Sequence, residues 1–259
     1  MIVKIRRNAR SFTGEYAFLA NYTYNLGADR LTTFGQQEMV HSGINYYERY
    51  KDLTQDLTPF MRSSGEGRVL QSAQKWMQGF HEAKMSDGKA KKDFGYPYDI
   101  FVVGEDTGSN NTLNHGLCNR FENGRDSLIA SAAQTEWTNI FVPPVQARVN
   151  TMLPGANLTQ ADIISLMDLC PFSTVASPVG KISQFCSLFT QKEWQQYDYY
   201  ETLNKYYGYS YGNPLGPTQG VGFANELVAR LTSTPVHDHT STNRTMDSSN
   251  TTFALERKL

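Results

Sequence analysis

The sequence predicts an α-rich protein with very few β-strands. About seven segments carry apolar residues at helical spacing, while a single run, 98–103, has the composition of a strand. Two helical segments open with a Thr-x-x-Glu/Gln pattern, in which side chains satisfy the free backbone groups of a helix start. This inventory is unbalanced for a self-contained α/β protein.

The expected helices are distributed along the whole chain. The first is opened by a Thr33/Gln36 capping box and covers 33–53, and the second begins near Arg68 with an apolar face from Val69 to Phe80. Prolines interrupt the next pattern, so it is divided into a helix over 127–141 and another from Pro143 to about Pro154. The remaining helices are capped by Thr159, opened by a Thr190/Glu193 box, and predicted from the spacing of Phe223, Leu227 and Leu231. The Gly/Pro-rich stretch 208–222 is expected to be an ordered loop.

Composition excludes several classes of function. The 259 residues suffice for one large domain or two small ones, and 39% are hydrophobic. The 24 basic residues are balanced by 25 acidic ones, so neither a nucleic acid nor an anionic membrane is indicated as a partner. No apolar run approaches the roughly 20 residues of a membrane span. The basic segment 1–7 is too short in apolar residues to be a signal peptide.

Five Asn-x-Ser/Thr triplets nevertheless indicate a secreted, glycosylated protein. They begin at Asn21, Asn110, Asn157, Asn243 and Asn250. The alternative is a surface that is simply rich in Thr and Asn.

The chain has three cysteines, an odd number that leaves one thiol unpaired in a secreted protein. A bridge between Cys170 and Cys186 would close a short loop, stabilise the fold by roughly 3 kcal/mol and leave Cys118 alone. No Cys-x-x-Cys pair occurs, which disfavours a zinc ribbon or a thioredoxin-like site.

The segment 62–68 is a candidate anion site. It contains small residues at the expected start of the second helix, where free N–H groups and the helix dipole favour negative charge. Arg68 could hold a phosphate through two hydrogen bonds. Ordinary helix capping with a solvated Arg68 is the alternative.

The histidines give weaker signals. His237 and His239 could supply two metal ligands, but no third ligand follows from spacing, and a surface loop is the better interpretation, so no metal site is predicted. The sequence contains no Gly-x-Ser-x-Gly elbow, no P-loop and no Gly-x-Gly-x-x-Gly pattern. The residues alone therefore indicate a secreted, α-rich chain with a candidate anion site.

Several segments together resemble fungal phytases of the histidine acid phosphatase family. The resemblance runs in order from about residue 14 to about residue 253. Its segments are 31–35, 42–44, 68–69, 111–118, 165–170, 205–208, 212–217, 222–227 and 238–243.

The resemblance implies an α/β (α+β) fold in which a mixed α/β sheet domain is joined to a smaller, mostly helical domain. On this basis we expect a partial α/β domain over 1–66, a mostly helical domain over 67–205 with one strand near 98–104, and a return to the partial α/β domain over 206–259. Central strands of the family's sheet are expected to be missing.

The resemblance also implies a chemistry. In this family a histidine of an Arg-His-Gly-x-Arg-x-Pro motif attacks phosphorus, arginines clamp the phosphate, and an aspartate of a His-Asp motif protonates the leaving alcohol, without metal or organic cofactor. Its phytases release phosphate from inositol hexakisphosphate (phytate), typically in acid. Arg68 matches a phosphate-binding arginine, and Lys205 and Asp168 match residues of the substrate cleft. Asn114 stands where relatives carry an aspartate.

The two catalytic motifs do not carry over. No Arg-His-Gly occurs in the chain, and His237-Asp238 matches a different segment of the family, so we expect the chain to be catalytically incomplete. Cys170 and Cys186 match a family disulfide, and Cys118 matches a cysteine whose partner lies in a later region. Two alternatives remain, a non-catalytic binder of inositol phosphates or other anions and a chain that does not fold stably. The family is secreted, and nothing indicates an oligomeric state.

Overall fold

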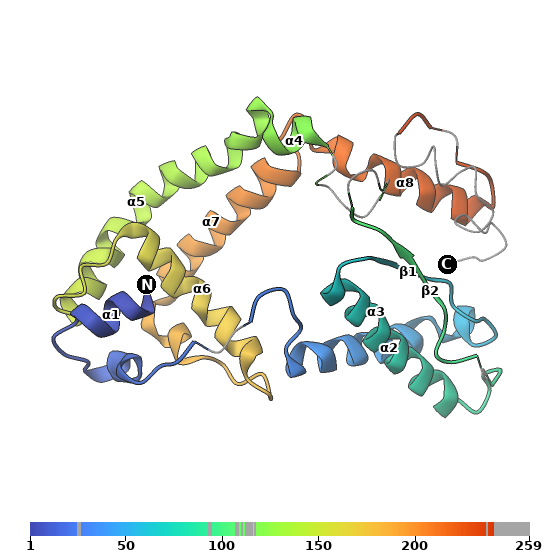
Figure 1. Ribbon diagram of the computed structural model, residues 1–259, viewed down its shortest axis with the longest axis horizontal. Coiled ribbons are helices and arrows are strands. Elements are labelled where there is room, and N and C mark those ends of the chain that lie inside the picture. Colours follow the sequence, from blue (N-terminus) through green and yellow to red (C-terminus); the bar gives the residue numbers. More distant parts are fainter. Residues whose placement is uncertain are drawn as a thin grey trace. The chain divides into compact units, whose positions relative to one another are not determined.

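The structure is a computed structural model that describes residues 1–24, 27–92, 95–106, 109, 111, 116, 118–236 and 238–240. Helices dominate these residues, and two short strands form a parallel sheet (Figure 1). The prediction of an α-rich chain with few strands is confirmed.

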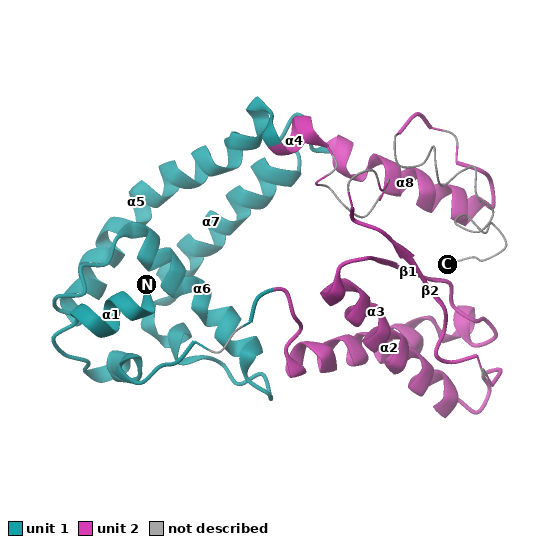
Figure 2. Cartoon of the chain, viewed as in Figure 1, with its two compact units in different colours: residues 1–28, 123–216 teal, residues 29–122, 217–259 magenta. Residues whose placement is uncertain are grey.

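Contacts divide the chain into two compact units that alternate along the sequence (Figure 2). Unit 1 comprises Met1–Ala28 and Asn123–Gly216, and unit 2 comprises Asp29–Glu122 and Pro217–Leu259. The short helix α4 (Asn119–Asn123) lies where the chain passes from unit 2 to unit 1. This grouping differs from the boundaries expected after 66 and 205, because 29–66 packs with 67–122 rather than with 1–28. As a statement about independently folding domains, the expected division stays a prediction.

Unit 1 is helical. Its elements are α1 (Ile2–Asn8), η1 (Gly14–Ala20), η3 (Arg125–Leu128), α5 (Ile129–Met152), α6 (Gln160–Ala176), η4 (Gln184–Leu188) and α7 (Gln191–Tyr209). The long helices α5 and α7 lie side by side. One apolar cluster, with Val145, Val149, Ile163, Leu166 and Phe185 among its members, forms the core of this unit.

Helix α5 corrects one prediction. It runs without interruption through Pro143 and Pro144, where the sequence predicted the end of one helix and the start of another. Proline removes a backbone donor and usually kinks a helix. Buried Phe141 and Val142 before the prolines and Val145 after them enter the same core, so packing keeps the two halves in one helix.

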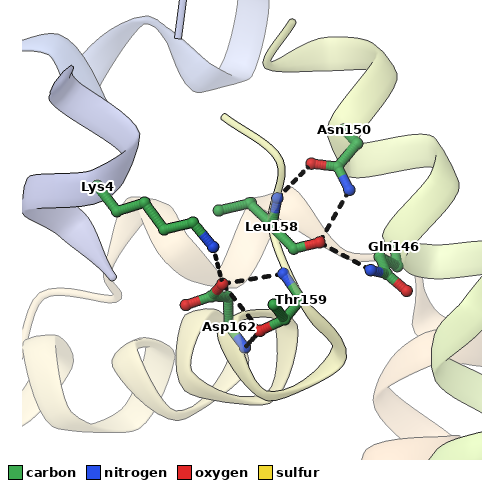
Figure 3. Close-up of polar contacts among 6 residues, drawn as sticks. All are labelled: Lys4, Gln146, Asn150, Leu158, Thr159 and Asp162. Carbon is green, nitrogen blue, oxygen red and sulfur yellow. Dashed lines mark hydrogen bonds and ion pairs between the residues drawn. The ribbon is translucent and has the colours of Figure 1, made fainter. Parts of the chain in front are cut away.

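Helices α6 and α7 start as predicted. Thr159 and Asp162 form a complete capping box at α6, and Thr190 and Glu193 form one at α7. The α6 cap is tied to two other elements (Figure 3). Lys4 Nζ of α1 lies 2.6 Å from Asp162 Oδ2, and Asn150 Oδ1 of α5 accepts from the Leu158 N–H at 2.7 Å.

Cys170 near the end of α6 and Cys186 in η4 form a disulfide with a Cα–Cα distance of 4.7 Å. This is the pair that the family resemblance implied. Cys118 carries a free thiol in the structure.

The main feature of unit 2 is a tight helix pair, α2 (Thr33–Thr54) and α3 (Gly67–Ser86). Gly43 and Gly79 lie at their crossing, where a Cβ on Gly79 would be 1.9 Å from the Val40 carbonyl oxygen. Only glycine permits such a backbone approach. Helix α2 starts at Thr33, as predicted. Its N-cap is Thr32 rather than Thr33, because the Thr32 hydroxyl accepts from the Gly35 N–H at 2.9 Å.

Strands β1 (Met61–Ser64) and β2 (Ile100–Val103) pair in parallel, with Met61 opposite Ile100 and Ser64 opposite Val103. The strand predicted over 98–103 is confirmed. The first strand was missed, since 62–68 was expected to be only the start of a helix.

Helix α8 (Pro217–Thr232) is attached to β1 by buried charges. Glu226 Oε1 lies 2.5 Å from Arg62 Nη1 and 3.0 Å from Arg230 Nε. The helix begins inside the stretch 208–222 that was expected to be a loop, because Pro217 fits the first turn of a helix.

Candidate functional site

Arg68 projects from the first turn of α3, just after the carboxyl end of β1. In sheets with parallel strands, ligands bind beyond this end of the strands. Ser64 ends the strand, and only Gly65 and Glu66 separate it from the helix. Unit 2 therefore presents the candidate phosphate ligand at the sheet edge where an anion is expected.

Two carboxylates hold the Arg68 guanidinium in the structure. Arg68 Nη1 donates to Asp29 Oδ1 at 2.6 Å, and it also donates to Glu66 Oε1. The Arg68 side chain is 42% exposed, so an incoming anion can reach it. Such exposed ion pairs contribute little free energy and can be exchanged for a more strongly charged partner.

The start of α3 is less open to anions than the sequence indicated. The Glu66 N–H donates to Glu105 Oε1 at 3.3 Å, and the Ser64 hydroxyl donates to the same oxygen. A carboxylate of the chain itself thus lies where the helix dipole favours negative charge. The side chain of Arg68 is the principal positive group at this position.

Asp168 belongs to unit 1, where it lies on α6 facing α7. The Tyr197 hydroxyl donates to Asp168 Oδ1 at 2.5 Å. Burial raises the pKa of Asp168, although the Tyr197 hydrogen bond acts in the opposite direction. Burial, together with the bond to Asp168, also raises the pKa of Tyr197.

Lys205 lies in the same unit, two turns beyond Tyr197 on α7, with Nζ 5.4 Å from the centre of the Tyr209 ring. Glu201 lies between them. Burial and the negative charge of Asp168 raise the pKa of Glu201, while the positive charge of Lys205 lowers it. The structure thus brings Asp168 and Lys205 into one electrostatic cluster through Glu201, which we call the α6–α7 cluster (Asp168, Tyr197, Glu201 and Lys205).

Neither Glu201 nor the carboxylates around the start of α3, those of Asp29, Glu66 and Glu105, were predicted as parts of a site. Glu201 had a local signal, since it lies four residues before Lys205 on a helix and such pairs share a face. Glu66 belonged to the segment 62–68 itself. Asp29 and Glu105 gave no such signal, because only the tertiary fold brings Asp29 to Arg68 and Glu105 to Ser64 and Glu66.

Other predicted positions lie partly outside the described residues. Asn110, Asn114, His237, Asn243 and Asn250 are among the residues that the structure leaves out, whereas Asn21 and Asn157 are exposed. Within the described ranges, no group of three or more His, Cys, Asp or Glu side chains could hold a metal ion. The helices described here include none that is long and apolar enough to cross a membrane.

Comparison with known proteins identifies the family of the chain. The family model of the Histidine phosphatase superfamily (branch 2) matches residues 1–259. The chain belongs to this family. It is 48% identical over 261 residues to Phytase A of Aspergillus oryzae and 49% identical over 261 residues to Phytase A of Emericella nidulans, in both cases across 100% of this chain and 55% of the relative.

A solved structure has a similar fold. The crystal structure of the phytase from D. castellii matches with a TM-score of 0.69 and 25% identity, over 88% of this chain and 50% of that one. The resemblance to fungal phytases and the α/β fold class are thereby confirmed. The chain spans about half the length of the curated relatives it matches.

Proposed function

We propose that this chain forms part of a phytase-like phosphomonoester hydrolase, with Arg68 as a phosphate ligand and the α6–α7 cluster as part of the substrate cleft. The observation that carries the proposal is Arg68 at the carboxyl end of a parallel strand, in a chain of the histidine phosphatase family. Relatives that match the chain throughout are named Phytase A, which supports phytate as the substrate.

In the proposed reaction a histidine nitrogen attacks phosphorus. The P–O bond to the alcohol breaks as an N–P bond forms, an aspartic acid protonates the alcohol, and water then hydrolyses the phosphohistidine. Arg68 would stabilise the charge on the equatorial phosphate oxygens. The 259 residues contain no Arg-His-Gly motif to supply the nucleophile, so we propose that they do not turn over substrate alone.

The raised carboxyl pKa values of the α6–α7 cluster favour binding of a phosphate-rich substrate in acid. Burial raises the pKa of Asp168, and burial together with the negative charge of Asp168 raises the pKa of Glu201. They become neutral at a less acidic pH than ordinary carboxyls do. Below that pH the positive charge of Lys205 is no longer offset, which favours a phosphate-rich ligand.

The test of turnover is direct. The chain is incubated with phytate or an aryl phosphate at about pH 5, where ordinary carboxyls are ionised and histidine is protonated. We expect no phosphate release that depends on a histidine of this chain. Release that a His→Ala substitution abolishes would contradict the claim that the chain alone is inactive.

The test of the site measures binding of inorganic phosphate by phosphorus NMR. Arg68→Ala should abolish saturable binding, while Arg49→Ala, which removes an exposed arginine of α2 in the same unit, should leave it unchanged. Equal loss in both variants would mean that binding is a general charge effect. Tight binding by the unaltered chain without turnover would favour the alternative of a non-catalytic anion binder.

We also propose that the protein is secreted and glycosylated. Asn21 and Asn157 begin Asn-x-Ser/Thr triplets and are exposed, as acceptor sites must be. Expression in a secreting fungal host should give a protein whose mass falls on enzymatic removal of N-glycans. A mass that does not change would exclude these sites.

A further inference from the structure

The turn 64–66 joins β1 to α3 and precedes Arg68. The turn lies directly against the end of β2. A Cβ on Gly65 would be 3.2 Å from the Val103 carbonyl oxygen and 3.5 Å from the Gly104 Cα. The segment after β2, residues 104–105, is therefore the natural support for the turn.

Glu105 makes that support through two hydrogen bonds. Its Oε1 accepts from the Glu66 N–H at 3.3 Å and from the Ser64 hydroxyl. The first bond fixes the backbone at the residue that caps α3, and the second fixes the last residue of β1. One carboxylate oxygen thus joins both ends of the turn.

Asn111 orients the Ser64 hydroxyl toward Glu105. Its Nδ2 donates to Ser64 Oγ at 2.9 Å and to the Gly104 carbonyl at 3.2 Å. Because Ser64 Oγ accepts from Asn111, its own proton is available to Glu105. Ser64 is 5% exposed and Asn111 is 0% exposed, so these bonds are protected from water and strengthen one another.

We propose that Glu105 is a positioning residue that holds the 64–66 turn and thereby the place of Arg68. Glu66 ends this turn and contacts Arg68 with its own carboxylate, so a shift of the Glu66 backbone moves both ends of that pair. The role assigned to Arg68 rests on the proposed function. The hold of Glu105 on the turn does not, and it can be tested separately.

The experiment measures hydrogen exchange in the full 259-residue chain by NMR, at the Glu66 amide and at the Arg68 Nη1 protons, which bond to Asp29 and Glu66. In Glu105→Ala both should exchange about five- to tenfold faster, as expected for loss of a protein hydrogen bond. Glu105→Gln keeps an acceptor oxygen and should behave like the unaltered chain. Glu38→Ala, which removes an exposed carboxylate on α2, is the matched control and should change neither rate.

Phosphate affinity supplies the second measurement. Glu105→Ala should weaken binding of inorganic phosphate by about tenfold, and Glu105→Gln should restore it to within about twofold. Restoration by glutamine separates a positioning role from a purely electrostatic one. If glutamine fails to restore either measurement, or if the Glu66 amide exchanges equally fast in Glu105→Ala and the unaltered chain, the inference is wrong.

The two hypotheses fail in different ways. If Arg68→Ala leaves phosphate binding unchanged, the proposed function fails while the amide result still decides the role of Glu105. Should Glu105→Ala not fold, Ser64→Ala takes its place, because it removes one of the two donors to Glu105. Unchanged exchange at the Glu66 amide in Ser64→Ala would then overturn the inference.

Discussion

Most buried apolar side chains of unit 1 form one cluster, whereas most of those described in unit 2 form two smaller clusters, and unit 2 also holds buried charged groups. The buried charged residues of the described chain are Lys84, Glu226 and Arg230, and all three belong to unit 2. A buried charge stabilises little but is costly to leave without its partner. Substitution of a charged side chain should therefore lower the free energy of unfolding more in unit 2 than in unit 1.

The largest expected effect is in unit 2. Glu226→Gln removes the carboxylate charge that faces the buried Arg230 and the largely covered Arg62, and should lower the free energy of unfolding by about 3–5 kcal/mol. Urea unfolding monitored by fluorescence checks this, because Trp76 belongs to unit 2 while Trp137 and Trp194 belong to unit 1. The exposed Glu38→Gln is the control. A loss below about 1 kcal/mol would remove the contrast between the units.

A second effect tests the helix crossing of unit 2. Gly79→Ala forces a Cβ against the Val40 carbonyl, so the helices must separate, and we expect a loss of about 3 kcal/mol. Gly220→Ala is the matched control, because a Cβ at Gly220 on α8 meets nothing within 4 Å. That change should be neutral or should stabilise by up to about 1 kcal/mol. A Gly79→Ala protein as stable as the control would mean that the crossing is looser than described.

A smaller effect concerns Asp162 of unit 1. Burial alone would raise its pKa, but hydrogen bonds from Lys4 and Thr159 lower it overall. A carboxyl with a lowered pKa adds stability above the unfolded pKa, and this stability is lost as pH falls through the folded pKa. Asp162→Asn should therefore cost about 1 kcal/mol at neutral pH, and this cost should shrink as pH falls through the lowered pKa of Asp162. Thermal unfolding across this range checks the profile, and a pH-independent loss would indicate a packing effect.

The smallest effect has the opposite sign, although Asp168 lies on the same helix. Because its pKa is raised by burial, Asp168 adds stability when protonated, and this is lost as pH rises through the folded pKa. Asp168→Asn should therefore stabilise unit 1 at neutral pH by less than about 1 kcal/mol, since the amide oxygen can still accept from Tyr197. The gain should vanish in acid. A loss at neutral pH would show that the charge of Asp168 supports the fold.

The sequence predicted what depends on neighbouring residues. Thr159 and Thr190 start helices because the capping contacts lie within three residues. Strand β1 could not be predicted, because its four residues become a strand only by pairing with β2. The continuity of α5 could not be predicted either, because it depends on the packing of residues before and after its prolines in the same core.

The candidate site shows the same division. Arg68 was identified from its segment and from the family resemblance, and Lys205 and Asp168 from the resemblance alone. Their surroundings were not, because Asp29 reaches Arg68 across 39 residues and Glu105 reaches Ser64 across 41. The chemistry of a residue can thus be predicted before its neighbours can.

The ion pair between Arg62 and Glu226 also constrains how the chain folds during synthesis. The two residues are 164 positions apart, and the intervening chain contains most of unit 1. The ribosome synthesises Arg62 long before Glu226. Unit 2 therefore cannot be completed by α8 until residues 123–216 have emerged. An incomplete unit 2 is therefore exposed to chaperones and proteases for as long as residues 123–216 take to emerge.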